Sequence, residues 1–96
     1  MSNIAGSGAQ AYTVGADGQV VTGKGRLIGL TLSNGVSVGG VSILYDNTSA
    51  AGTKLATIQS AANDIAVIMF GDEGVEFDNG VYADWTSGVL TVYVKQ

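Results

Sequence analysis

The feature that most constrains the fold is a short run of alternating apolar and polar residues, repeated along the chain and closed each time by a glycine-containing turn. In residues 26–33, for example, Ile28, Leu30 and Leu32 share one face, and Asn34-Gly35 then supplies a turn. Alternation with a period of two is typical of β-strands. The runs recur every 8–12 residues, which predicts an all-β fold, either an antiparallel β-sandwich or a small jelly-roll-like barrel of about eight short strands.

The run at residues 65–70 differs from the others because it is apolar on both faces. Ile65, Val67 and Met69 alternate with Ala66, Ile68 and Phe70 and not with polar side chains. A strand of this kind has apolar neighbours on both sides, so the pattern predicts a buried strand. The other runs expected to form strands are 10–14, 19–22, 26–33, 41–46, 81–85 and 89–95.

One segment allows two interpretations. Ala51, Leu55, Ile58 and Ala62 follow the spacing of a helical stripe. A glycine and two threonines within the segment weaken a helix, and every neighbouring run is strand-like. We therefore expect a strand at residues 53–59, with a helix as the alternative.

The chain is long enough for one core and too short for two. It has 96 residues, and a second domain would leave each half too small to bury a core. Residues 10–96 are expected to form a single sandwich domain. Residues 1–9, which include Ile4, carry little apolar weight and are expected to form an N-terminal arm.

Several function classes are excluded by residues that the chain does not have. It contains no cysteine and no histidine, so disulfides, thiolate metal sites and the Ser-His-Asp or Cys-His hydrolases are ruled out. We expect no enzyme activity, no catalytic residue, no cofactor and no metal. Only 4 basic residues stand against 8 acidic ones, so no nucleic-acid partner is expected.

The low charge density points to a protein partner. Charged residues make up 12% of the chain, about half of the usual ~25%. The surface must therefore be built largely from small polar and apolar side chains, which suits a chain that packs against copies of itself or against other proteins. No run approaches 18 apolar residues and the start resembles no signal peptide, so we expect folding in a cytoplasm and no membrane partner.

Residues 18–24 partly match a phosphate-binding loop. Gly-Gln-Val-Val-Thr-Gly-Lys fits the first seven positions of the motif, but the eighth is Gly25, where Ser or Thr would ligate Mg²⁺. The residues that follow alternate as a strand and not as a helix. A glycine-rich connection is the preferred interpretation.

A cluster of acidic residues occupies positions 72–78. Asp72, Glu73, Glu76 and Asp78 carry oxygen ligands of the kind that Ca²⁺ prefers, but they lack the spacing of an EF-hand loop. We interpret the segment as a solvated loop or a contact between subunits.

Three aromatic residues offer an alternative function. Tyr82, Trp85 and Tyr93 are candidates for a platform on which sugar rings stack. Aromatic residues near strand ends more often pack in a core or an interface.

The sequence resembles small β-sandwich proteins found among the structural genes of tailed bacteriophages. The likeness starts with residues 40–55, Gly-Val-Ser-Ile-Leu-Tyr-Asp-Asn-Thr-Ser-Ala-Ala-Gly-Thr-Lys-Leu, in which a strand ending in Tyr-Asp meets a turn of small residues. It continues with Asn-Gly-Val-Tyr at 79–82 and the closing Gly-Val-Leu-Thr-Val-Tyr-Val at 88–94. It covers residues 26–94 and is carried by turn and strand residues, not by a catalytic signature.

The resemblance implies a virion structural protein, above all a capsid decoration (cement) protein that binds and stabilises the head shell. A head-fibre or tail component that recognises host surface carbohydrate is the alternative. The implied partners are the major capsid protein or other virion proteins and further copies of the chain, for example in a trimer. The implied location is the virion, assembled in the host cytoplasm. For partner contact we single out Ile4, Tyr12, Arg26 and Trp85.

Overall fold

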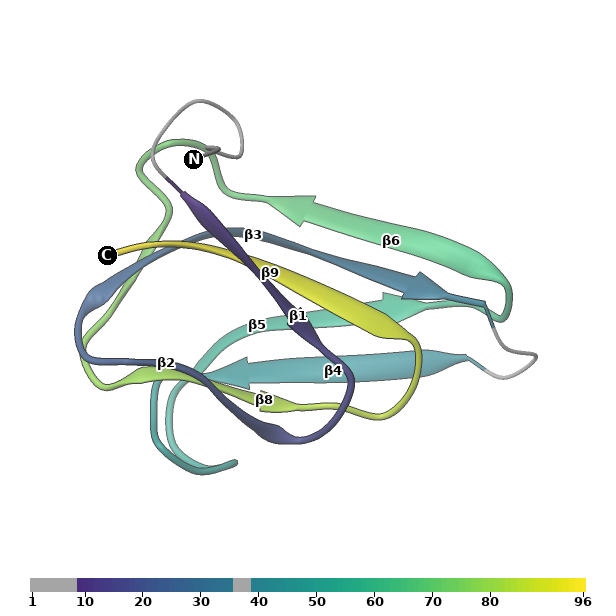
Figure 1. Ribbon diagram of the computed structural model, residues 1–96, viewed down its shortest axis with the longest axis horizontal. Coiled ribbons are helices and arrows are strands. Elements are labelled where there is room, and N and C mark those ends of the chain that lie inside the picture. The colour runs from purple at the N-terminus through teal and green to yellow at the C-terminus, as the bar shows by residue number, and fades with distance from the viewer. Residues whose placement is uncertain (1–8, 36–38) are drawn as a thin grey trace.

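The described part of the protein is built from nine antiparallel strands in two sheets that pack face to face (Figure 1). The computed structural model describes residues 9–35 and 39–96. The prediction of an all-β antiparallel sandwich is confirmed. None of the described residues lies in a helix, so no helix in that part of the chain could cross a membrane.

The larger sheet has five strands. Its order is β1 (Gln10–Val14), β9 (Val89–Lys95), β3 (Gly25–Asn34) and β6 (Asp64–Met69), and β7 (Val75–Phe77) pairs with the first residues of β3. Both β6 and β7 lie along the same side of the long strand β3, one after the other. The acidic segment therefore contains a strand that the sequence analysis interpreted as loop, which brings the number of strands to nine.

The smaller sheet has four strands, in the order β2 (Gly18–Thr22), β8 (Gly80–Asp84), β4 (Gly40–Tyr45) and β5 (Lys54–Ser60). The ambiguous segment is thus a strand, as expected. It pairs with β4 from Gly40↔Ser60 to Tyr45↔Lys54 and turns Ile58 into the core. This long-range pairing outweighs the helical spacing of its apolar residues.

The core lies between the sheets and consists of the residues of each strand that point inward. A bulge in β3 decides which residues these are: Leu27 pairs with Val94 and Gly29 with Tyr93, so Ile28 is an extra residue between them. Because of it, Leu27 shares the buried face with Leu30, from which simple alternation had separated it. The fully buried large side chains include Leu27, Leu30, Leu32, Leu44, Ile58, Phe77, Val81, Leu90 and Val92.

Strand β6 is not buried, and that prediction is wrong. It forms an edge of the five-stranded sheet, where Ile65, Val67 and Met69 are 64%, 59% and 54% exposed. Within the described parts of the chain β6 pairs only with β3. Its second apolar set, Ala66 and Ile68, packs against the core.

The expected N-terminal arm, residues 1–9, lies outside the described residues except for Ala9. Ala9 is fully buried, directly before β1 begins at Gln10. The described chain therefore enters the sandwich at the edge of the five-stranded sheet.

Candidate interaction surface

Three adjoining rows of residues on the side of the five-stranded sheet that points away from the core are here called the outer face. The pairings of β6, β3, β9 and β1 align its residues in three rows that run across the sheet. From one end to the other, the rows are Ile65, Ser33 and Val89; Val67, Thr31, Thr91 and Thr13; and Met69, Gly29, Tyr93 and Ala11.

None of the side chains in these three rows is charged, whereas the next row on the same side of the sheet, Glu76, Arg26 and Lys95, consists of charged residues. Val89 is 50% exposed, and with Ile65, Val67 and Met69 it belongs to the exposed large apolar residues of the described chain. Gly29 keeps the face flat, since the sulfur of Met69 lies where a side chain at position 29 would stand. Contiguous exposed apolar surface marks protein interfaces more often than chance.

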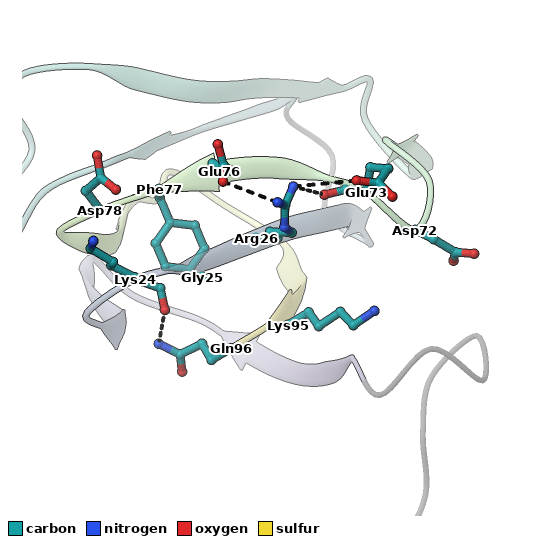
Figure 2. A pocket seen from close by; sticks show the side chains of 10 residues that line it. All are labelled: Lys24, Gly25, Arg26, Asp72, Glu73, Glu76, Phe77, Asp78, Lys95 and Gln96. Carbon is teal, nitrogen blue, oxygen red and sulfur yellow. Dashed lines mark hydrogen bonds and ion pairs between the residues drawn. The ribbon is translucent and has the colours of Figure 1, made fainter.

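A second feature, here called the charged groove, lies where β3 begins beside β7 (Figure 2). It is an open depression of about 520 Å³. Three of the four basic residues of the chain, Lys24, Arg26 and Lys95, line it together with the acidic residues of the 72–78 segment. These cations are scattered in the sequence and meet only because β3 pairs with both β7 and β9.

Arg26 holds the groove together. Its Nη1 donates to the carbonyl oxygen of Glu73 at 2.9 Å, and its Nη2 donates to Oε2 of Glu76 at 3.2 Å (Figure 2). The Arg26 side chain is 40% exposed, and both acidic side chains are largely in solvent. The groove is thus an exposed ion-pair network.

The acidic side chains of the groove do not gather at one point. Across residues 9–35 and 39–96, no three acidic side chains are placed to hold a metal ion. Of the four acidic residues only Glu76 lies in β7, and its neighbour Phe77 points into the core. The contacts of Arg26 link β3 to the acidic segment at residues 72–78.

Replacing Arg26 with alanine is therefore expected to lower the free energy of unfolding by no more than about 1 kcal/mol, because exposed ion pairs contribute little. The measurement is urea unfolding of the wild type and the variant at low and high salt. The difference should shrink as salt screens the pair. A loss of several kcal/mol that persists at high salt would contradict this view of the groove.

The residues singled out for partner contact lie in separate places. Tyr12 is half-buried on the edge strand β1, where its hydroxyl donates to Oε1 of Gln10 at 2.8 Å. Trp85 follows β8, and its indole Nε1 donates to the carbonyl oxygen of Gly88 at 2.8 Å. Arg26 lies in the charged groove, and Ile4 lies outside the described residues. Tyr12, Arg26 and Trp85 are not brought together.

The three aromatic residues do not form one platform. Tyr82 alternates with buried Val81 and Ala83 and so faces outward from the four-stranded sheet. Tyr93 points outward from the other sheet, on the opposite side of the sandwich. The partial phosphate-loop match lies on strand β2 and the turn after it, and strand β3 follows where that motif requires a helix.

The sequence analysis missed Ile65, Val67, Met69 and Val89 as interface candidates. The signal was present in the run apolar on both faces, but it was interpreted as burial within the chain. The structure shows that only the face of β6 with Ala66 and Ile68 packs against the core, whereas the face with Ile65, Val67 and Met69 is exposed.

No family model matches this chain, and no curated protein or solved structure matches it. What the chain does is therefore inferred from the outer face, the charged groove and the sequence resemblance.

Proposed function

We propose that this protein is a non-enzymatic structural subunit of a tailed-bacteriophage virion, and that it decorates the head shell by binding the major capsid protein through the outer face. The observation that carries the proposal is the uncharged outer face with its exposed Ile65, Val67, Met69 and Val89. The resemblance of residues 26–94 to small virion β-sandwich proteins supports the viral context.

The outer face is small enough that one copy alone would bind the capsid weakly. Four strands about 4.8 Å apart and about six residues long at ~3.4 Å each span roughly 400 Å². That is about half of the ~800 Å² that one partner contributes to a standard stable interface. A single contact would be weak, whereas many copies that bind neighbouring sites on one shell hold together through avidity.

The proposed mechanism is passive. Docking of the outer face removes apolar side chains from water, which favours binding by about 25 cal/mol per Å² of apolar area. No charged group within the three rows has to be desolvated, provided that the neighbouring charged row, Glu76, Arg26 and Lys95, stays at the solvated rim of the contact. The role requires no catalytic group.

The test is a matched pair of lysine substitutions, one on each outward side of the sandwich. Val89→Lys places a charge in the outer face, and Thr57→Lys places one at an exposed position of β5 in the other sheet. Binding to heads of the encoding phage, prepared without this protein, is measured by co-sedimentation. We expect Val89→Lys to weaken binding about 10-fold to 100-fold, since the lysine would be buried without a partner.

Thr57→Lys should bind as the wild type does. Both variants must retain the β-sheet circular-dichroism spectrum of the parent. Equal binding of Val89→Lys and wild type, or an equal loss in both variants, would overturn the assignment of the outer face.

A further inference from the structure

Among residues 9–35 and 39–96, no strand pairs with the outer edge of β6. In Figure 1 no strand lies beyond β6, and the side chains of Ile65, Val67 and Met69 are more than half exposed. The pairing of β6 with β3 runs from Gly29↔Met69 to Asn34↔Asp64 without a bulge. Residues 65–70 carry no charge and no proline. Bulges, lysines and prolines are the usual means by which edge strands avoid pairing with other chains.

The other sheet edges are protected. The pairing of β2 with β8 and that of β5 with β4 are both interrupted by bulges, and β5 begins with Lys54. The edge strand β1 exposes Gln10, Ala11 and Thr13, none of which is a large apolar residue. Among the described strands, only β6 combines a regular edge with a row of exposed apolar side chains.

One hydrogen bond to β3 shows which backbone groups β6 presents at this edge. The amide of Phe70 donates to the carbonyl oxygen of Ile28 at 2.8 Å, so the N–H of residue 70 points toward β3. Because the direction alternates along a strand, the N–H and C=O groups of Ile65, Val67 and Met69 point to the open side. Consistent with this, the Ile65 amide donates to Oδ1 of Asp64 at 2.8 Å, a hydrogen bond that pairing with another strand would have to replace.

We propose that β6 of one copy pairs antiparallel with β6 of a second copy around a two-fold axis that passes beside Val67. In this register Val67 lies opposite Val67 of the second copy, and Ile65 lies opposite Met69. All three are the residues whose N–H and C=O groups point outward, so each opposing pair meets in hydrogen-bonding geometry. Shifts to either side would leave one of these residues without an opposing partner.

The side chains favour a second copy as the occupant of this edge. Cross-strand pairs of β-branched and long apolar residues stabilise antiparallel sheets, and Val67–Val67 and Ile65–Met69 are such pairs. Asp64, the charged residue of β6, would lie opposite Phe70 of the second copy. The two Asp64 side chains would therefore not face each other. An isologous pair of this kind closes on itself as a dimer.

The role of this dimer rests on the proposed function, because the dimer would enlarge the surface that binds the capsid. A two-fold axis perpendicular to the sheet keeps both outer faces on the same side. The dimer would then present one continuous face of twice the area, close to the size of a standard stable interface. The formation of the dimer itself does not depend on a capsid and is tested on the purified chain.

The first test removes a single edge hydrogen-bond donor. Val67→Pro deletes an N–H that points away from β3, so the β3–β6 pairing is kept, whereas Val67→Thr has similar shape and retains the N–H. Sedimentation velocity over a range of concentrations measures the dissociation constant of the dimer. We expect Val67→Pro to raise it about 30-fold or more and Val67→Thr to change it less than about 5-fold. A monomeric wild type, or a Val67→Pro variant that dimerises like the wild type, would overturn the proposal.

The second test uses the two-fold axis and does not require the proline variant to fold. Val67→Lys and Val67→Glu should each be monomeric, because like charges would stand opposite each other at the axis. An equimolar mixture of the two should form a heterodimer. A mixture that stays monomeric, or either variant that dimerises alone, would contradict the register.

The failure of this inference can be told apart from failure of the proposed function. Val89→Lys, two strands away from the β6 edge, should still dimerise while it loses binding to heads. A loss of the dimer in Val89→Lys would show that the outer faces stack and that β6 does not pair. A chain that binds heads but never dimerises would overturn only the pairing.

Discussion

Replacement of Phe77 by alanine is expected to lower the free energy of unfolding by about 3–5 kcal/mol. Phe77 is 1% exposed and contributes its whole ring to the core from β7, a strand of three residues. A domain of this size is stabilised by about 5–15 kcal/mol in total, so the variant should lie close to the limit of folding.

The effect should be strongest around the charged groove. The ring of Phe77 lies over Gly25, and it is the fully buried residue of β7. Without it, the acidic segment would be held against β3 by the short backbone pairing of β7, by partly buried Val75 and by the exposed ion pairs of Arg26. Urea unfolding gives the total loss, and hydrogen exchange of residues 72–78 shows where it begins.

The matched control for Phe77→Ala is Glu76→Ala, one residue earlier in the same strand. Its side chain is exposed and takes part in a surface ion pair, so a change of no more than about 1 kcal/mol is expected. A loss of less than about 1 kcal/mol in the free energy of unfolding of Phe77→Ala would contradict the view that the buried Phe77 ring anchors β7.

Replacement of Gly80 by alanine is expected to cost about 3 kcal/mol. Gly80 has φ of +123°, a conformation that favours glycine, and it is buried where β8 begins opposite Thr22. A Cβ atom there would lie 2.5 Å from the carbonyl oxygen of Val21, which belongs to the backbone of β2 and cannot rotate away. The pairing of β2 with β8 must shift to accept it.

Gly15→Ala serves as the control for this substitution. No atom lies within 4 Å of a Cβ placed at position 15, and its φ is not in the region that favours glycine. Alanine there should change the free energy of unfolding by less than about 1 kcal/mol, with stabilisation expected because the unfolded chain loses freedom. Thermal unfolding of both variants makes the comparison. Equal stabilities would contradict the close approach at Gly80.

Much of the fold follows from alternation alone, and its exceptions have physical causes. The strand at residues 54–60 was expected because threonines and strand-like neighbours weigh against a helix. The short strand β7 was not, because its Val75 and Phe77 stand among acidic residues that are typical of a loop. Leu27 was placed on the wrong face of β3 because a bulge changes the alternation without any mark in the sequence.

The candidate surface was predictable only in part. The apolar run at 65–70 indicated that both faces of β6 are covered, but alternation cannot tell a covering layer of the same chain from one supplied by another molecule. The charged groove could not be predicted, since Arg26 meets Glu73 and Glu76 through the register of β3 and β7. Such long-range pairings depend on the assembled sheet.

The central claim is that this chain is a repeated subunit of a virion head shell. Quantitative mass spectrometry of purified virions tests it most directly, with the copy number of the chain scaled to that of the major capsid protein. The account predicts a ratio set by the capsid lattice. A ratio as low as that of tail components, or absence of the chain from the particle, would contradict it.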